Sequence, residues 1–194
     1  MAVIADAQTN SLDQINFASD KHVASINECQ ILVVGKLGTD SRTYHVEVSG
    51  QGYFALRIIE PKDRYNQFES TLSSISHPNI VQLARLVETP TSIFLLHTFY
   101  DKGSLDLIIH NHPTRPIRED VVKIIIFNIL QACAYIHSQG YMHGNITPEH
   151  ILFKSIEGQN QHFNVALSNL KNSNTLNSPI ESALGEEGKL FYAV

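Results

Sequence analysis

The stretch Tyr141-Met142-His143-Gly144-Asn145-Ile146-Thr147-Pro148-Glu149-His150-Ile151-Leu152-Phe153 decides the fold. It follows a long apolar segment and ends in an apolar triplet, so we interpret it as a polar loop between two buried elements. Gly144 and Asn145 are typical of a tight turn, because glycine tolerates a positive φ and asparagine tolerates the left-handed region. Pro148 prevents a helix from continuing through the loop. Loops between rigid elements often carry functional residues, so this loop is a candidate site.

The segments on either side of the loop predict helices before it and a hairpin after it. Residues 116–138 form the longest expected helix, with acidic residues in the first turn and an apolar surface on nearly every side. A shorter helix is expected over 104–111, with a serine as its N-cap. After the loop, the apolar segments 151–153 and 163–167 predict the two strands of a hairpin.

The N-terminal half predicts a sheet and one helix. Residues 1–29 are mixed and polar, so we expect a flexible tail. Apolar residues recur every three or four positions over 62–75, which predicts an amphipathic helix. Glycine-containing turns join the first three of the expected strands, as in an antiparallel meander. The five expected strands are 31–34, 44–48, 53–59, 83–88 and 93–97.

Composition and charge restrict the class of protein. The 194 residues are 43% hydrophobic and 17% charged with a net charge of −5, so a nucleic-acid partner is not indicated. Cys29 and Cys133 form no metal-spaced pair, and we interpret them as free thiols in a reducing compartment. The N-terminus has no signal-peptide pattern, and the apolar segment 121–136 is too short for a membrane span. We therefore expect a soluble cytoplasmic protein.

Several short motifs occur in a fixed order along the chain. They are Ala55-Leu56-Arg57, His77-Pro78-Asn79-Ile80-Val81, Asp101-Lys102-Gly103-Ser104-Leu105, His137-Ser138-Gln139-Gly140, the loop 141–153 and the segment 188–194. Together with the order of elements, they resemble the protein kinase family, whose catalytic loop has the pattern H-R-D-L-K-P-E-N-I-L. The resemblance implies an α+β, bilobal fold. Residues 30–97 would form a five-stranded antiparallel N-lobe with one helix, and 98–194 an incomplete helical C-lobe up to the activation segment.

Most of the polar positions that the family uses for phosphoryl transfer hold other residues here. Asn145 occupies the catalytic aspartate position, and an amide cannot accept the proton of a substrate hydroxyl. His150 occupies a position where the family binds metal through asparagine, and Mg²⁺ prefers oxygen ligands. The other replacements are Gly144 for the loop arginine, Thr147 for the loop lysine, Arg57 for the third-strand lysine, and Leu167, or Ser168 in a shifted register, for the metal-binding aspartate. These changes predict a pseudokinase, a catalytically inactive domain that acts as a scaffold or allosteric regulator.

Two other functions stay open. One is an atypical or residual ATP-dependent protein kinase, and the other is an ATP-binding switch that transfers no phosphate. We expect His143 to be structural, weak or absent ATP binding, and no bound metal. The resemblance implies a vestigial nucleotide pocket formed by Gly38, Ala55, Arg57, His97, Tyr100 and Leu152.

The partners follow from the same interpretation. We expect a protein partner, such as a kinase or a kinase substrate, and neither nucleic acid nor membrane. The sequence ends at Val194, before the family's P-E motif, so the helix over 116–138 would lack the later helix that covers it. We therefore expect a truncated gene product, or a helix covered by another chain or by self-association.

Overall fold

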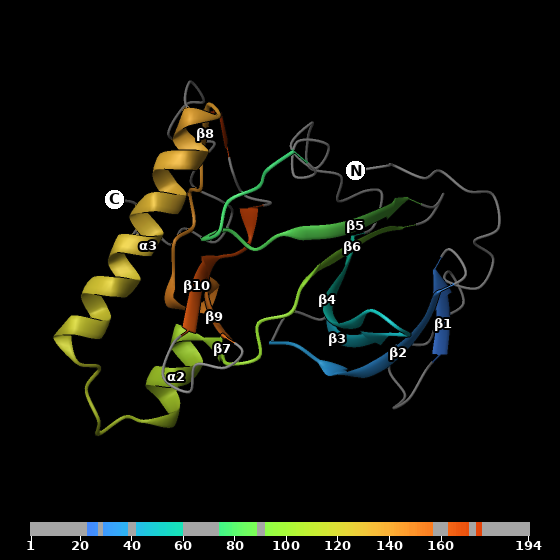
Figure 1. Ribbon diagram of the computed structural model, residues 1–194, viewed down its shortest axis with the longest axis horizontal. Coiled ribbons are helices and arrows are strands. Elements are labelled where there is room, and N and C mark those ends of the chain that lie inside the picture. The colour runs from blue at the N-terminus through green and yellow to red at the C-terminus, as the bar shows by residue number, and fades with distance from the viewer. Residues whose placement is uncertain are drawn as a thin grey trace. The chain divides into compact units, whose positions relative to one another are not determined.

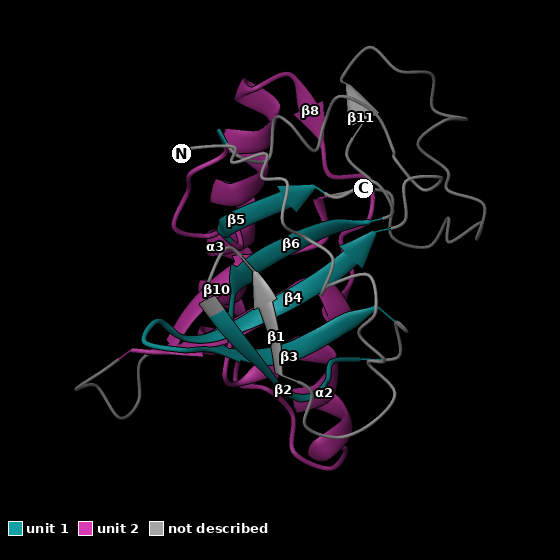
Figure 2. Ribbon diagram, turned by 90° about the vertical axis from the view of Figure 1, so that its right-hand side faces the viewer, with its two compact units in different colours: residues 1–74, 82–99 teal, residues 75–81, 100–194 magenta. Residues whose placement is uncertain are grey.

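The structure is a computed structural model of the chain. It describes residues 23–26, 29–38, 42–59, 74–88, 92–156, 163–170 and 174–175. The described residues divide into two compact units (Figure 2). The first contains the described residues up to 74 together with 82–99, and the second contains 75–81 and the residues from 100 onward.

The first unit is a six-stranded antiparallel sheet (Figure 1). Its strands follow the order β1-β2-β3-β4-β6-β5, so the first four form a meander and β5 lies at the far edge. All five predicted strands form. The bounds are β1 (Val23–Ile26), β2 (Cys29–Lys36), β3 (Thr43–Val48), β4 (Gly52–Ile59), β5 (Leu83–Glu88) and β6 (Ile93–Thr98).

The additional strand β1 corrects the prediction of a flexible tail over 1–29. It pairs with β2 from Val23 opposite Leu32 to Ile26 opposite Cys29. An edge strand is held mainly by backbone hydrogen bonds, so it needs no strong apolar alternation in its sequence. Residues 1–22 lie outside the described part of the chain.

The core of the first unit lies on one face of its sheet. Strand residues alternate between faces, and directly opposed residues share a face. Leu56, for example, is opposite Tyr44 on β3 and opposite Leu96 on β6. Burying a leucine or isoleucine side chain stabilises the fold by about 1.5–3 kcal/mol, so this layer holds the sheet together. Its buried members are Ile31, Val33, Val46, Val48, Leu56, Val87, Phe94 and Leu96.

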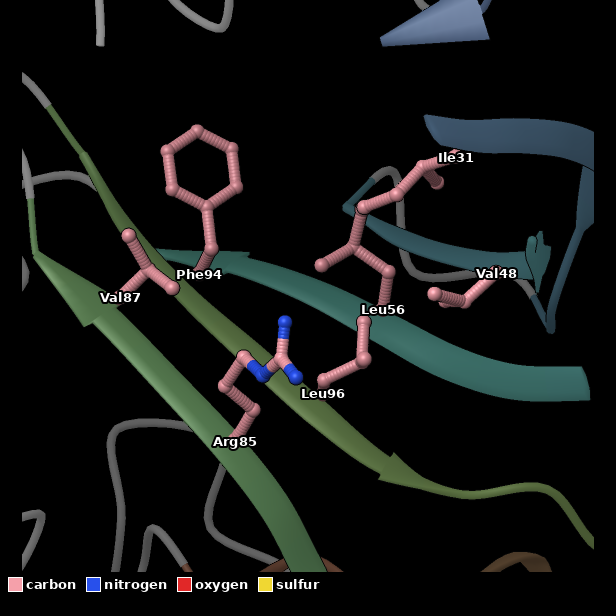
Figure 3. A pocket seen from close by; sticks show the side chains of 7 residues that line it. All are labelled: Ile31, Val48, Leu56, Arg85, Val87, Phe94 and Leu96. Atoms are coloured by element: carbon pink, nitrogen blue, oxygen red, sulfur yellow. The ribbon is translucent and has the colours of Figure 1, made fainter. Parts of the chain in front are cut away.

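A small cavity lies within this apolar layer (Figure 3). Arg85 is the one charged side chain among the seven that line it, which include Phe94 and Leu96. The cavity volume is about 10 Å³. That is room for about one water molecule, so the cavity is a packing defect rather than a ligand site.

The second unit combines two helices with short strands. A three-stranded sheet has the order β10-β9-β7, and β11 pairs with β8. As predicted, Ser104 caps the shorter helix, and its Oγ accepts a hydrogen bond from the Leu107 N–H at 3.2 Å. The elements are β7 (Gly103–Ser104), α2 (Leu105–Asn111), α3 (Glu119–Ser138), β8 (Tyr141–Met142), the 3₁₀ turn η2 (Pro148–His150), β9 (Ile151–Ser155), β10 (Phe163–Leu167) and β11 (Asn174–Thr175).

The long helix α3 buries one stripe and exposes the rest. Its buried residues, at spacings of three and four, are Ile125, Ile129, Ala132 and Ile136. Large apolar side chains on its other faces are more than half exposed, namely Ile124, Ile126, Phe127 and Leu130. We had predicted that this apolar segment is too short to span a membrane, and that prediction is wrong, because the helix has 20 residues. By length and composition it could do so, but one such helix is weak evidence, since core helices of soluble proteins pass the same test.

The segment 75–81 belongs to the second unit although β4 and β5 flank it in the sequence. Ile80 forms a parallel bridge with Leu167. The Leu167 N–H donates to the Asn79 carbonyl at 2.9 Å, and the Val81 N–H donates to the Leu167 carbonyl at 3.0 Å. The segment therefore acts as a neighbour of β10. The helix predicted over 62–75 lies outside the described residues except for its last two positions.

Candidate functional site

The predicted loop is held by His143, which is 2% exposed. Its Nε2 lies 2.8 Å from the Ser168 carbonyl oxygen, and its Nδ1 lies 3.2 Å from the Asn145 backbone nitrogen. A carbonyl only accepts and a backbone N–H only donates, so the ring is neutral and carries its proton on Nε2. Burial lowers the pKa of His143 to about 4, in agreement with a neutral ring. His143 therefore fastens the loop to the residue after β10.

The turn after His143 depends on Gly144, whose φ is 72°. A side chain in this region clashes with the backbone, which glycine avoids. The kinase pattern has an arginine here, so the glycine removes a positive charge from the loop. The Asn145 backbone is fixed through its N–H and its carbonyl oxygen. The path of the loop therefore does not depend on the Asn145 side chain.

His150 ties the end of the loop to its beginning. Its Nδ1 lies 2.9 Å from the Asn145 carbonyl oxygen and 3.1 Å from Thr147 Oγ1. Its Nε2 lies 2.9 Å from Asn169 Nδ2. Because the carbonyl must accept, Nδ1 carries the proton and Nε2 accepts from the Asn169 amide. Both ring nitrogens are thus engaged in holding the loop, and Thr147 is buried beside them.

Ser168 and Asn169 complete the site at the end of β10. The Ser168 N–H and Oγ–H both donate to the His150 carbonyl, at 2.8 and 3.0 Å. Asn169 has a φ of 66°, a left-handed conformation that asparagine tolerates better than most residues. Asn169 is a site residue that we did not predict. The available signal was its place as a polar residue just after a buried strand.

Leu167 is not a site residue, contrary to our prediction. It pairs with Ile151 within the sheet, and its side chain is completely buried. A side chain inside the core cannot face a ligand. The structure therefore favours the shifted register, in which Ser168 takes the position of the metal-binding aspartate.

A second hydrogen-bond network, centred on Asn79, links β10 to α3. Asn79 Nδ2 donates to Asn128 Oδ1 at 2.7 Å and to the Val165 carbonyl at 2.9 Å. His77 accepts from the Asn79 backbone N–H at 3.1 Å and stacks on Tyr135 with ring centroids 5.1 Å apart. The motif 77–81 thus links α3 to β10. Its role is to support the loop.

The predicted nucleotide residues divide between the two units. Gly38, Ala55, Arg57 and His97 lie in the first, and Tyr100 and Leu152 lie in the second. On the sheet of the first unit, Ala55 is flanked by His45 on β3 and by His97 on β6. Arg57 lies two residues further along β4, opposite Thr43 and Leu95.

Three of these residues have distinctive surroundings. Burial, with a contribution from the Arg57 charge, lowers the pKa of His97 to about 4, against the raising effect of a hydrogen bond to the Gln82 backbone. Burial raises the pKa of Tyr100. Gly38 is exposed and has a φ of 64°. The positive charge of Arg57 therefore acts on a neutral buried histidine.

The loop offers few ligands for a divalent cation. Within the described ranges, no group of three or more His, Cys, Asp or Glu side chains comes together. Asn145, Ser168 and Asn169 supply neutral oxygens, and both nitrogens of His150 are already hydrogen-bonded. Mg²⁺ is usually held through carboxylates as well as phosphate oxygens. The donor set does not fit Mg²⁺, and we assign no step to a metal.

Comparison with known proteins identifies the family. A model described as the protein kinase domain matches residues 34–179, well over half of the chain. The chain belongs to the protein kinase family. The predicted family and the α+β fold class are therefore confirmed.

Several curated kinases align with this kinase domain. The serine/threonine-protein kinase SSN3 of Pyricularia oryzae is 26% identical over 155 residues, covering 71% of this chain and 31% of the relative. The calcium/calmodulin-dependent protein kinase type IV of Mus musculus is 33% identical over 123 residues, which cover 60% of this chain and 25% of the relative. The maternal embryonic leucine zipper kinase of Xenopus tropicalis is 36% identical over 82 residues, which cover 42% of this chain and 12% of the relative. The aligned part of the chain thus spans a third or less of the length of each of these relatives.

The comparison corrects our functional prediction. We predicted a pseudokinase and no enzyme, but the aligned relatives carry the names of protein kinases, which favours our alternative, an ATP-dependent protein kinase. The prediction took the combined loss of the base, the metal ligands, the lysine and the phosphate-binding glycines as a loss of activity. In phosphoryl transfer, catalysis comes almost entirely from positioning and electrostatic stabilisation, and these are spread over many groups.

Proposed function

We propose that this kinase domain is part of an atypical ATP-dependent serine/threonine protein kinase. The observation that carries the proposal is the hydrogen-bonded loop 143–150. Two histidines fasten this loop to the residues that follow β10. Such a loop gives a fixed place for a substrate hydroxyl, and fixed placement is a major part of catalysis. The names of the aligned kinases support the same reaction class.

The reaction transfers the γ-phosphoryl group of ATP to a serine or threonine. The hydroxyl oxygen forms a bond to the γ-phosphorus, the bond from that phosphorus to the β,γ-bridging oxygen breaks, and ADP leaves. The hydroxyl proton passes to solvent, because the Asn145 amide cannot take it. The Asn145 side chain contributes a hydrogen bond that orients the hydroxyl.

The missing base sets the expected rate. A positioned base contributes about 10²–10⁴ in rate. Typical kinases turn over at about 1–100 s⁻¹, so we expect about 10⁻⁴–1 s⁻¹ for this loop.

The other properties belong to the same proposal. ATP binds weakly, because Arg57 and a single glycine, Gly38, stand where the family has a lysine and a glycine-rich loop. The partner is a protein substrate, in keeping with a net charge of −5 and no dense basic patch. A cytoplasmic location is supported by the free thiol of Cys133.

The test is phosphate transfer from γ-labelled ATP to a mixed library of serine- and threonine-containing peptides. We expect slow transfer by the wild-type chain and a further loss in Asn145→Ala, whose backbone hydrogen bonds remain available. The matched control is Asn111→Ala, at the exposed end of α2. Transfer that is absent at both Mg²⁺ and Mn²⁺, or equal in wild type and Asn145→Ala, would refute the proposal.

A further inference from the structure

The connection between α2 and α3 contains two prolines and two arginines, each pair three residues apart. Its sequence is Pro113-Thr114-Arg115-Pro116-Ile117-Arg118. The polyproline II helix has three residues per turn, so residues three apart lie on the same edge of it. In that conformation the two prolines share one edge and the two arginines share a second. The threonine and the isoleucine share the third.

This connection lies on the surface of the second unit. Figure 1 shows it as a loop at the lower left, between the ends of α2 and α3. Residues 112–118 are exposed, apart from the half-buried Ile117. Among the described residues, their hydrogen bonds and ion pairs all join positions within four residues of each other in the sequence. A partner can therefore contact the segment without displacing a long-range hydrogen bond or ion pair.

The backbone is already in the polyproline II conformation at one end of the segment. Arg118 has a φ of −62° and a ψ of 143°. At the other end, the Arg115 N–H donates to the His112 carbonyl at 3.0 Å and closes a turn over Pro113 and Thr114. Extending the whole segment breaks this one exposed hydrogen bond. The helix α2 that precedes it has no buried residue, so its last turn can adjust.

Both arginines are accessible to a partner. Arg115 is exposed, and its side chain has no hydrogen bond or ion pair among the described residues. Arg118 Nη2 lies 2.6 Å from Asp120 Oδ2, but both side chains are more than half exposed, so this pair contributes little and can exchange. The end of α2 accounts for Pro113, because proline is common just after a helix. It does not account for arginines at the same spacing as the prolines.

We propose that segment 113–118 binds the SH3 domain of a partner protein in the polyproline II conformation. Segments with two prolines three residues apart dock in the aromatic-lined groove of such domains, which contacts the proline edge. Carboxylates at the border of that groove pair with the arginine edge, because a guanidinium group matches a carboxylate through two parallel hydrogen bonds. The inference goes beyond the proposed function and does not rest on it, since loop 143–150 takes no part.

The experiment measures binding of the full chain to an array of purified SH3 domains by surface plasmon resonance. Purified WW domains, which also recognise polyproline II segments, form the comparison set. We expect saturable binding to at least one SH3 domain, and competition by a proline-rich peptide ligand of that same domain. Raising the salt concentration from about 0.05 M to about 0.5 M should weaken binding, because salt screens exposed charges.

Variants then assign the contact to the two edges. The double variant Pro113→Ala, Pro116→Ala should bind at least about tenfold more weakly. The double variant Arg115→Ala, Arg118→Ala should also bind more weakly, and its affinity should depend less on salt. The matched control is Thr114→Ala, on the third edge of the same segment, and it should keep the wild-type affinity. All five side chains are exposed, so each variant should keep the wild-type urea midpoint.

Three results would overturn the inference. The first is the absence of saturable binding to any SH3 domain of the array, and the second is binding to WW domains alone. The third is an affinity that survives the loss of both prolines, or that falls as far in Thr114→Ala as in the proline variant. Phosphate transfer is measured on the same preparations, and we expect the proline variant to match the wild type in that assay.

Discussion

The substitution His143→Leu tests whether one buried ring holds the loop. Leucine fills similar space but leaves the Ser168 carbonyl and the Asn145 N–H without partners. Each buried group left unpaired costs about 1–3 kcal/mol. We therefore expect the free energy of unfolding to fall by about 2–6 kcal/mol at pH 7.5. A typical domain has about 5–15 kcal/mol in total, so the loss is large.

The same substitution should also change the dependence of stability on pH. Burial lowers the folded-state pKa of His143 to about 4, below the ordinary histidine value of 6.5. Between these values the unfolded chain binds more protons, so stability is present above pH 6.5 and is lost as the pH falls toward 4. A difference of 2.5 pKa units corresponds to about 3 kcal/mol. His143→Leu should lack this pH-dependent part of the stability.

Urea unfolding followed by circular dichroism at several values between pH 4 and pH 7.5 measures both effects. The control is His112→Leu, whose side chain is exposed, and it should follow the wild type within about 0.5 kcal/mol. An unchanged unfolding midpoint for His143→Leu at pH 7.5 would refute the assigned hydrogen bonds. If the free energy of unfolding of His143→Leu fell with pH between 6.5 and 4 as steeply as that of the wild type, the burial of a neutral ring would be refuted.

Two further substitutions test the support around the loop. Asn79→Ala removes two hydrogen bonds and should lower the free energy of unfolding by about 1–3 kcal/mol. Asn164→Ala, at an exposed position of β10, should change that free energy little. Similar losses for the two variants would contradict the hydrogen-bond network of Asn79. Ile136→Ala should lower the free energy of unfolding, measured with urea, by about 2–5 kcal/mol. Leu130→Ala, on the exposed side of α3, should lower it by less than about 0.5 kcal/mol. Equal losses would show that α3 buries a different face.

The sequence predicted those elements whose side chains report their surroundings. Strands β2 and β3 alternate between more and less buried positions, and β6 is a short run of buried apolar residues, so both kinds of pattern indicate strands. The loop 141–153 was identifiable because Gly144 and Pro148 exclude a continuing helix. The serine cap of α2 was identifiable for a similar local reason.

What the sequence did not predict depends on long-range hydrogen bonds. The strand β1 is held by its backbone pairing with β2, which leaves little trace in side-chain type. The choice between Leu167 and Ser168 depends on which side chain is buried, and adjacent strand residues face opposite sides. The contacts of His150 with Asn169 join positions 19 residues apart. No local pattern indicates such a pair.

The placement of segment 75–81 has a consequence for synthesis on the ribosome. Ile80 emerges 87 residues before its bridge partner Leu167. Translation proceeds at about 5–20 residues per second, so this segment waits about 4–17 s for its neighbour. During that interval β2, β3 and β4 are complete and can pair. Ile75 and Ile80, which are buried in the folded protein, stay accessible to chaperones and to other nascent chains until then, and a slower ribosome prolongs that exposure.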